Sequence, residues 1–534
     1  MSDYARPIES SLEPVVTTLD QPRVEGRSRL PDRRQVLAGV SASYVQSAIA
    51  LLVGFISTPL YVKYLGGELF GLWVTLWSII GYFHLSTTGT MMTGTVWIAE
   101  AHARGEKEKM SRMLVTTSFI WLAAAALAIV VLAFLVAFGV IRASLFGDSP
   151  AVTAVALPVL MILAAGFLVS QPLDVFRLAV RSCQRVDLEQ SYTAIFRVVI
   201  LVAGITVLVL GGGLIGFALV TVLGQLGLEL AFAGAARRIV PGLRLSPSLF
   251  DAQMARQFIS PSLHFLAISI AGSLIWGTDN LVISINLGTA SVTLFAVAMQ
   301  LLNIGSGLIA TTVNALMPTV TALHALSEEI KLRRVLLRVV KIGFALATLL
   351  GVGFASFGEE LLRLWVGASY LAPRSVLSVL LAIFLIRAFA MLFEMVVMGT
   401  LRHHRYAYMV LAEGILNLAL SLILVKRWGL LGVALGTLMA QVACTGWFLP
   451  ALAMRVTGCR LKEVILKSVL PVLPAVAIAA LAAQLFTMLP LDPGWTRFLI
   501  GSGLTASAFA AGFWLTGLNA EEKELFRLMR KGVR

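Results

Sequence analysis

The chain has 534 residues, of which 58% are hydrophobic and only 13% are charged, and its formal net charge is +14 at pH 7. Soluble domains carry roughly 25% charged residues, so this composition excludes an ordinary water-soluble fold. Nucleic-acid binding is also disfavoured, because the basic residues are spread over loops between hydrophobic segments and form no patch interleaved with aromatic residues.

The N-terminal segment, residues 1–34, is polar and contains four prolines: Pro7, Pro14, Pro22 and Pro31. It lacks the apolar core of a cleavable signal peptide. We therefore expect a disordered cytoplasmic tail.

Long hydrophobic segments follow this tail, several of them without any Asp, Glu, Lys or Arg over more than the roughly 20 residues that a membrane helix needs. The run at residues 280–327 is divided at Leu287-Gly288-Thr289, where one helix should end and the next begin. Polar and apolar positions do not alternate, so the pattern is not that of a transmembrane barrel. We predict about fourteen spans, at residues 35–62, 69–99, 112–140, 151–176, 191–210, 213–234, 258–285, 290–320, 337–357, 374–400, 407–425, 430–453, 467–489 and 496–517.

Lys and Arg are distributed unequally over the two sides of this map. With the N-terminus inside, most of the 42 fall in cytoplasmic connections or tails. This is the positive-inside bias, so both termini are predicted to be cytoplasmic. The basic residues in outer connections are Lys63, Arg142, Arg363, Arg374, Lys426, Arg427 and Arg497.

An internal repeat relates two halves of the chain. Leu65-Gly66 aligns with Leu287-Gly288, and a glycine-rich motif beginning at Gly213 recurs at Gly429. Because each unit holds an even number of helices, the copies share orientation and are related by an axis along the membrane normal, with substrate between them.

The expected fold is an all-α polytopic membrane protein with two six-helix lobes related by a pseudo-two-fold axis, plus two C-terminal helices. We place the N-lobe at residues 35–234, a cytoplasmic linker at 235–257 and the C-lobe at 258–454. The last two helices and a cytoplasmic C-terminus occupy residues 455–534.

Charged residues inside predicted spans are the best candidates for a substrate site, because each costs about 2.5–3.5 kcal/mol at the bilayer centre. Asp174, Arg177 and Arg181 follow one another at helical spacing, which gives a basic face toward the cytoplasm. A solvated helix end is the alternative interpretation. Arg197 and Arg387 complete the set that we expect to line the cavity.

Three acidic residues are candidates for ion coupling. Glu413 and Arg197 are equivalent in the two repeats, so we expect them to face each other across the cavity, with a structural ion pair as the alternative. Glu394 shares a helix face with Arg387. Asp279 lies deep in its span and suits proton uptake and release, unless it serves only as a structural hydrogen-bonding group.

No cofactor or metal site is predicted. Cys183, Cys444 and Cys459 lack metal-binding spacing, and the glycine run at residues 211–213 lacks the Lys-Ser or Lys-Thr of a nucleotide-binding loop. The isolated His84 is expected to be a hydrogen-bonded interior residue.

Three segments carry a resemblance to a known family: residues 64–73 after the first span, 99–108 after the second, and 417–437. In this order they resemble the multidrug/oligosaccharidyl-lipid/polysaccharide exporter superfamily, and within it the flippases for lipid-linked O-antigen and exopolysaccharide units. The resemblance covers about residues 35–517. The chain departs from the usual pattern at Ser86-Thr87-Thr88-Gly89, where an Asp-x-Gly is common.

The resemblance implies a transporter of a bacterial inner membrane, without enzymatic activity. Its cargo would be a polyprenyl-diphosphate-linked oligosaccharide, moved from the cytoplasmic to the outer leaflet by alternating access, with H⁺ or Na⁺ as a coupling ion. Membrane lipids, a polysaccharide polymerase and chain-length proteins are the implied partners.

The alternatives are a lipid-linked peptidoglycan precursor flippase and a cation-coupled multidrug exporter. From another class, a polysaccharide polymerase or glycosyltransferase would need a larger outer loop than the one at residues 358–373.

Overall fold

The computed structural model describes residues 33–139, 141, 149–258, 272–275, 277–400 and 403–524. The polar tail predicted at residues 1–34 lies outside this part, apart from its last two residues. Within the described residues the secondary structure is helical, without strands. Eleven of the described helical stretches are long and apolar enough to cross a membrane. Two of the eleven contain a break, at Gly66 and at Gly429, and half of the span predicted at 258–285 is not described, so fourteen stays a prediction.

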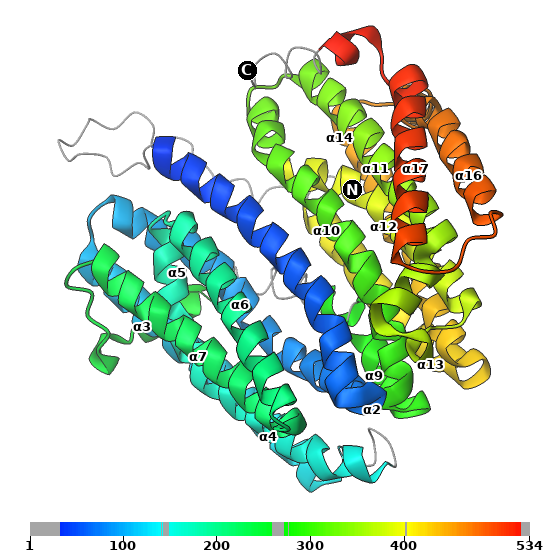
Figure 1. Cartoon of the computed structure of the whole chain (residues 1–534). Coiled ribbons are helices and arrows are strands. Elements are labelled where there is room, and N and C mark those ends of the chain that lie inside the picture. The colour runs from blue at the N-terminus through cyan, green and yellow to red at the C-terminus, as the bar shows by residue number, and fades with distance from the viewer. Residues whose placement is uncertain are drawn as a thin grey trace, which may run out of the picture.

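The N-terminal half forms one lobe, which occupies the lower left of Figure 1. Gly66 breaks its first long helix with a φ of 76°, a left-handed backbone conformation that glycine adopts without strain. Trp121, Phe217 and Phe232 are fully buried in its core. The helices of this lobe are α2 (Arg33–Ala103), α3 (Lys107–Ala137), α4 (Pro150–Leu173), α5 (Val175–Ser182), α6 (Val186–Val209) and α7 (Gly213–Ile239).

The second lobe follows a connection that contains the short η4 (Pro247–Leu249). The helix boundary predicted at Leu287-Gly288-Thr289 is confirmed, since α9 ends at Leu287 and α10 begins at Thr289. The elements of this lobe are α9 (Thr278–Leu287), α10 (Thr289–Ala325), α11 (Glu329–Val366), η5 (Ala368–Tyr370), α12 (Arg374–Gly399), α13 (His403–Ala443) and α14 (Thr445–Thr457).

Backbone geometry agrees between the two lobes at the positions that the repeat matches. Gly66 has φ 76° and ψ 169°, and Gly288 has φ 80° and ψ 165°. Gly213 and Gly429 have φ values of 57° and 56°. These dihedral angles suit glycine and strain most other residues, so the repeat preserves the two glycine turns that reverse the chain in each lobe.

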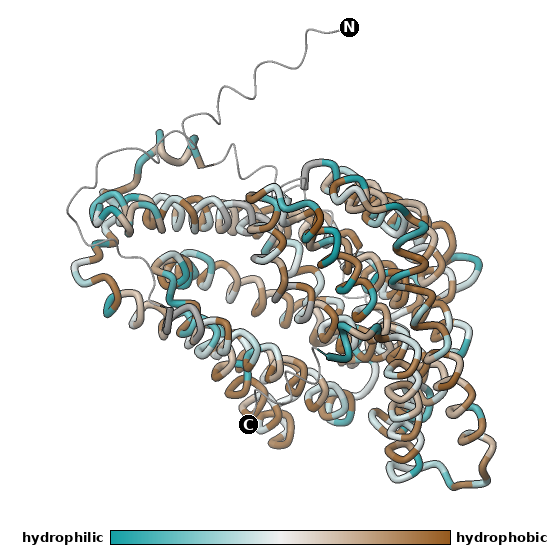
Figure 2. The backbone as a smooth tube through the Cα atoms, turned by 90° about the horizontal axis from the view of Figure 1, so that it is seen from above, coloured by the Kyte–Doolittle hydropathy of each residue, from teal (hydrophilic) through white to brown (hydrophobic). Residues whose placement is uncertain are grey.

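The last helices pack against α11 on the outside of the C-lobe, in orange and red in Figure 1. Pro471 and Pro474 lack a backbone N–H, which accounts for the irregular π and 3₁₀ turns that open the first of them. Figure 2 shows hydrophobic residues over much of the length of the helices. The elements are α15 (Leu461–Val464), η6 (Ile465–Val469), η7 (Leu470–Val472), α16 (Leu473–Thr487), α17 (Trp495–Gly512) and η8 (Phe513–Gly517).

A buried ion pair fastens this C-terminal unit to α11. Lys341 Nζ donates to Glu522 Oε2 at 2.7 Å and to the carbonyl oxygen of Gly517 at 3.2 Å. The two charged side chains are only 8% and 10% exposed. Each charge is therefore compensated mainly by the other.

Replacing Lys341 by methionine is expected to destabilise the protein by about 3 kcal/mol, because the Glu522 carboxylate would remain buried without its partner. A lowered melting temperature in detergent micelles would register this loss. The double substitution Lys341→Met and Glu522→Gln should recover most of it, and a double variant as unstable as the single one would contradict a role for the pair.

Candidate functional site

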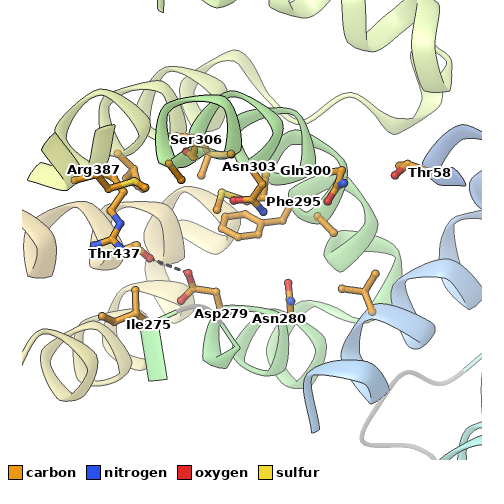
Figure 3. A pocket seen from close by; sticks show the side chains of 18 of the residues that line it. Thr58, Ile275, Asp279, Asn280, Phe295, Gln300, Asn303, Ser306, Arg387 and Thr437 are labelled. Atoms are coloured by element: carbon orange, nitrogen blue, oxygen red, sulfur yellow. Dashed lines mark hydrogen bonds between the residues drawn. The ribbon is translucent and has the colours of Figure 1, made fainter. Parts of the chain in front are cut away.

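A cavity of about 470 Å³ lies between the lobes. The N-lobe contributes α2, and the C-lobe contributes α9, α10, α12 and α13. Figure 3 shows its polar side chains converging from these elements. Its polar lining includes Thr58, Asp279, Asn280, Gln300, Asn303, Ser306, Arg387 and Thr437.

Asp279 stands in the first turn of α9 and is 5% exposed. Its Oδ2 accepts a hydrogen bond from the Thr437 hydroxyl at 2.9 Å, and its Oδ1 accepts one from Asn417 Nδ2 at 3.3 Å. The Ser421 hydroxyl lies 3.2 Å from Asn417 Oδ1 and 3.5 Å from the carbonyl oxygen of Val433. The carboxylate thus accepts hydrogen bonds from an amide N–H and a hydroxyl, with the hydroxyl and amide oxygens of Thr437, Ser421 and Asn417 close by. Hard cations prefer such oxygen ligands, and the carboxylate can equally take up a proton.

Arg387 enters the same cavity from α12, and Figure 3 shows its side chain reaching toward Thr437 and Asp279. Its Nη2 lies 3.7 Å from Glu394 Oε2, and the Tyr406 hydroxyl donates to the other oxygen of Glu394 at 3.0 Å. Glu394 is not among the residues that line the cavity. The Arg387 guanidinium therefore pairs with Glu394 outside the cavity, and Arg387 itself lines the cavity beside Asp279 and Thr437.

The structure does not bring Arg197 and Glu413 together. Arg197 lies on an exposed part of α6 and lines none of the cavities described here. Glu413 is 3% exposed, and its Oε2 accepts hydrogen bonds from the hydroxyl and, at 3.1 Å, from the backbone N–H of Thr445. The repeat fixes the helix and the depth of each residue but not the direction of its side chain, so the expected pairing is wrong.

A second cavity, of about 290 Å³, lies inside the N-lobe. Asp174 reaches it from the break between α4 and α5, next to Arg177, whose Nε lies 2.8 Å from Asp174 Oδ1. Gln225 Nε2 donates to Glu229 Oε1 at 2.8 Å, and both side chains line this cavity from α7. Arg181 does not line it. The three residues of the predicted basic face therefore do not stay together. Asp174 and Arg177 line the N-lobe cavity, and Arg181 does not.

Arg181 lies outside the N-lobe cavity. Its side chain is 40% exposed, and its Nη1 is 3.5 Å from Glu189 Oε1. His84 lines the N-lobe cavity, 3.3 Å from Gln171 Nε2.

Sequence reasoning missed Thr437 of the interlobe cavity, Asn417 and Ser421 next to it, and Gln225 and Glu229 of the N-lobe cavity. The first three lie in a segment that carries the family resemblance, and Gln225 and Glu229 are one helical turn apart on an apolar helix. Polar pairs four residues apart within a hydrophobic span share a helix face, and that signal would have singled out Asn417 and Ser421 as well.

The two lobes contact each other next to the glycine turns at Gly66 and Gly288. The Thr293 hydroxyl donates to the carbonyl oxygen of Gly67 at 2.5 Å. Trp365 Nε1 donates to the carbonyl oxygen of Phe55 at 2.8 Å, and the two rings stack with centroids 5.1 Å apart. We call this set of contacts the interlobe seam. Gly67 and Trp365 of this seam belong to connections that the charge distribution predicts to be outer.

Two helical lobes around a polar interlobe cavity define a membrane protein with a transporter-type fold. The chain belongs to the family described as polysaccharide biosynthesis protein, whose model matches residues 36–324. A comparison with curated proteins gives no match.

Solved structures share the fold at low sequence identity. A lipid II flippase MurJ in an inward closed conformation has a TM-score of 0.69 at 16% identity, covering 89% of this chain and 98% of its own. An inward-facing multidrug resistance MATE family transporter of the MOP superfamily has a TM-score of 0.60 at 17% identity, covering 79% and 98%. With the family match, these likenesses confirm the resemblance to this exporter superfamily and the all-α, two-lobe fold class.

Proposed function

We propose that the protein is a flippase that moves a polyprenyl-diphosphate-linked oligosaccharide from the cytoplasmic to the outer leaflet by alternating access. The observation that carries this proposal is the cavity between the lobes, where a cation and several neutral hydrogen-bonding side chains face a common space inside a hydrophobic molecule. The family match over residues 36–324 supports a cargo used in polysaccharide synthesis. In this scheme the chain transports its cargo and does not modify it.

The lining supports a cargo with two polar parts. Arg387 offers a planar guanidinium that can donate to a diphosphate through two N–H groups. Asn280, Gln300 and Asn303 present amide donors and acceptors that match sugar hydroxyls. A diphosphate near Arg387 and a glycan along these amides would place both polar parts of the cargo away from lipid.

The polar head needs a route from the membrane into the interlobe cavity, and an adjoining groove offers one. A third cavity, of about 580 Å³, lies between the first part of α2 and α10 and shares Gly307 and Ala310 with the interlobe cavity. Tyr44 and Leu51 are among the side chains along it. In our proposal the polar head enters between α2 and α10 while the lipid tail stays in the bilayer.

Asp279 is our proposed coupling residue. Binding of H⁺ or Na⁺ to its carboxylate would change the charge of the cavity wall and so bias the equilibrium between inward and outward states. Its hydrogen bonds with Asn417 and Thr437 connect α9 to the two parts of α13 that Gly429 separates. Ion binding at Asp279 would therefore act on three helical segments. Glu394 and Glu413 remain candidates for a second titrating group.

Transport is tested with purified protein in liposomes that contain a labelled polyprenyl-diphosphate oligosaccharide in the inner leaflet. Appearance of the label to an external, membrane-impermeant probe measures flipping. A lipid-linked peptidoglycan precursor serves as the comparison cargo in the same assay. Transport of that precursor alone would overturn our assignment of the cargo, and transport of neither would overturn the flippase proposal.

Arg387→Gln is expected to lower the rate of flipping by about 10- to 100-fold, since a hydrogen bond to a charged group contributes about 1.5–3 kcal/mol. The double variant Arg387→Gln and Glu394→Gln removes the carboxylate left without its partner, and it should remain impaired. Recovery of transport in the double variant would show that Arg387 serves only to neutralise Glu394. Arg363→Gln, on the exposed surface at the end of α11, is the matched control.

A further inference from the structure

A pocket rich in cations lies between α11 and the C-terminal helices, away from both lobe cavities. Its volume is about 530 Å³. The first turns of α11, the irregular turns η6 and η7, and the segment around the end of η8 form its walls. Two carboxylates, Glu521 and Glu522, line it. The cations are more numerous: Arg333, Arg334, Arg338, Lys341 and Lys467.

Neighbouring carboxylates neutralise only part of this charge. Glu463 is shared, because it pairs with Arg333 and also lies 3.7 Å from Lys467 Nζ. Arg338 Nη2 lies 3.3 Å from Glu521, whose side chain is 79% exposed, so this pair is solvated and weak. The pocket therefore keeps a surplus of positive charge, most accessible at the exposed Arg334 and at Lys467.

Exposed apolar side chains border the same pocket. Ile330 lines it and is 77% exposed, while Leu466 and Leu470 flank Lys467 on η6 and η7 and are 48% and 49% exposed. Leu515, on η8, is 72% exposed. These segments begin or end membrane-crossing stretches at the end of the bundle that the charge distribution predicts to be cytoplasmic. Cations thus lie at the boundary of the apolar surface, where lipid headgroups lie in a bilayer.

We propose that this pocket binds an anionic phospholipid of the adjacent leaflet. Arg334 and Lys467 hold the phosphate, and the acyl chains run along Leu466, Leu470 and Leu515. Basic pockets between membrane helices on the cytoplasmic side suit anionic headgroups in this way. The bound lipid would contact α11, η6 and η8 together, and so would fasten the two C-terminal helices to the C-lobe beside the Lys341–Glu522 pair. This site is separate from the proposed transport pathway.

Lipid binding is tested on the full chain, purified in detergent, by native mass spectrometry with no cargo present. The probes are dioleoylphosphatidylglycerol, dioleoylphosphatidylcholine and glycerol phosphate. We expect retention of the phosphatidylglycerol but not of the phosphatidylcholine, and no displacement by glycerol phosphate, which lacks the acyl chains. Arg334→Gln with Lys467→Gln should weaken retention by about 25-fold, which is about fivefold for each cation near the membrane surface.

Two comparison variants keep the result interpretable. Arg334→Lys with Lys467→Arg preserves both charges and should preserve binding, and Arg363→Gln with Arg374→Gln removes two exposed cations elsewhere and should leave binding unchanged. Equal retention of the two phospholipids, or an unchanged affinity in the Gln double variant, would overturn the proposal. Displacement of the lipid by glycerol phosphate would instead assign the pocket to a soluble phosphate compound.

Discussion

Replacing Asp279 by asparagine is expected to abolish the response of transport to an ion gradient while leaving the fold intact. The amide keeps the shape of the side chain, and its oxygen can still accept the hydrogen bond from Thr437. It cannot take up a proton, and it lacks the negative charge that holds a metal cation. Coupling between two sites typically amounts to about 1–3 kcal/mol, so flipping driven by a gradient should fall by about 5- to 150-fold.

The measurement is flipping in liposomes with and without an imposed pH or Na⁺ gradient. Wild-type protein should respond to one of the two gradients, and Asp279→Asn should give a single, slower rate that neither gradient changes. We call Asp279, Asn417, Ser421 and Thr437 the Asp279 cluster. Ser306→Ala, in the same cavity but outside this cluster, should keep the response. If Asp279→Asn responds normally while Glu394→Gln or Glu413→Gln does not, coupling belongs to one of those carboxylates.

Gly71→Ala is expected to disfavour the state in which the interlobe seam is closed. A Cβ added at Gly71 of α2 would lie 1.8 Å from the carbonyl oxygen of Thr289, at the start of α10. The Thr289 carbonyl is part of the backbone and cannot rotate out of the way as the end of a side chain can. The two lobes must therefore move apart at this point. Overpacking costs about 1–3 kcal/mol. If only the closed state bears this cost, the equilibrium between states shifts by about 5- to 150-fold.

Spin labels on Lys63 and Arg374, one on each lobe near the seam, report this shift as a longer interlobe distance. The matched control is Gly81→Ala, farther along the same helix, where an added Cβ meets no atom within 4 Å. An unchanged distance distribution in Gly71→Ala would show that the seam does not depend on this close approach. We expect flipping to slow in the same variant, because the equilibrium no longer samples both states evenly.

The sequence was sufficient to predict the class of fold and several boundaries, because membrane spans are long uninterrupted apolar runs. Gly66 and Gly288 could be matched from the repeat because their backbone angles suit glycine. Helix rotation could not be predicted. Arg197 is exposed and Glu413 is buried, although the repeat makes them equivalent, because the apolar character of each span is nearly uniform around its circumference.

The Asp279 cluster shows a second limit of sequence reasoning. Asn417 and Thr437 lie 138 and 158 positions from Asp279 along the chain, and only the packing of α9 against α13 brings them together. Asp279 could be proposed alone because an acid within a span is unusual. The helical spacing of Asn417 and Ser421 marks a polar helix face but does not say which residue that face meets, so its contact with Asp279 required the structure.

The interlobe seam also affects how readily the protein opens when no cargo is bound. Opening at that end must break the Thr293–Gly67 and Trp365–Phe55 hydrogen bonds and unstack the Phe55 and Trp365 rings. Each hydrogen bond contributes about 1 kcal/mol and the ring pair about as much. An empty molecule would have to meet this cost without help from bound ligand, so it would rarely open at that end. Under the proposed ion coupling, idle copies would then conduct few ions, and many could reside in the membrane without a large leak.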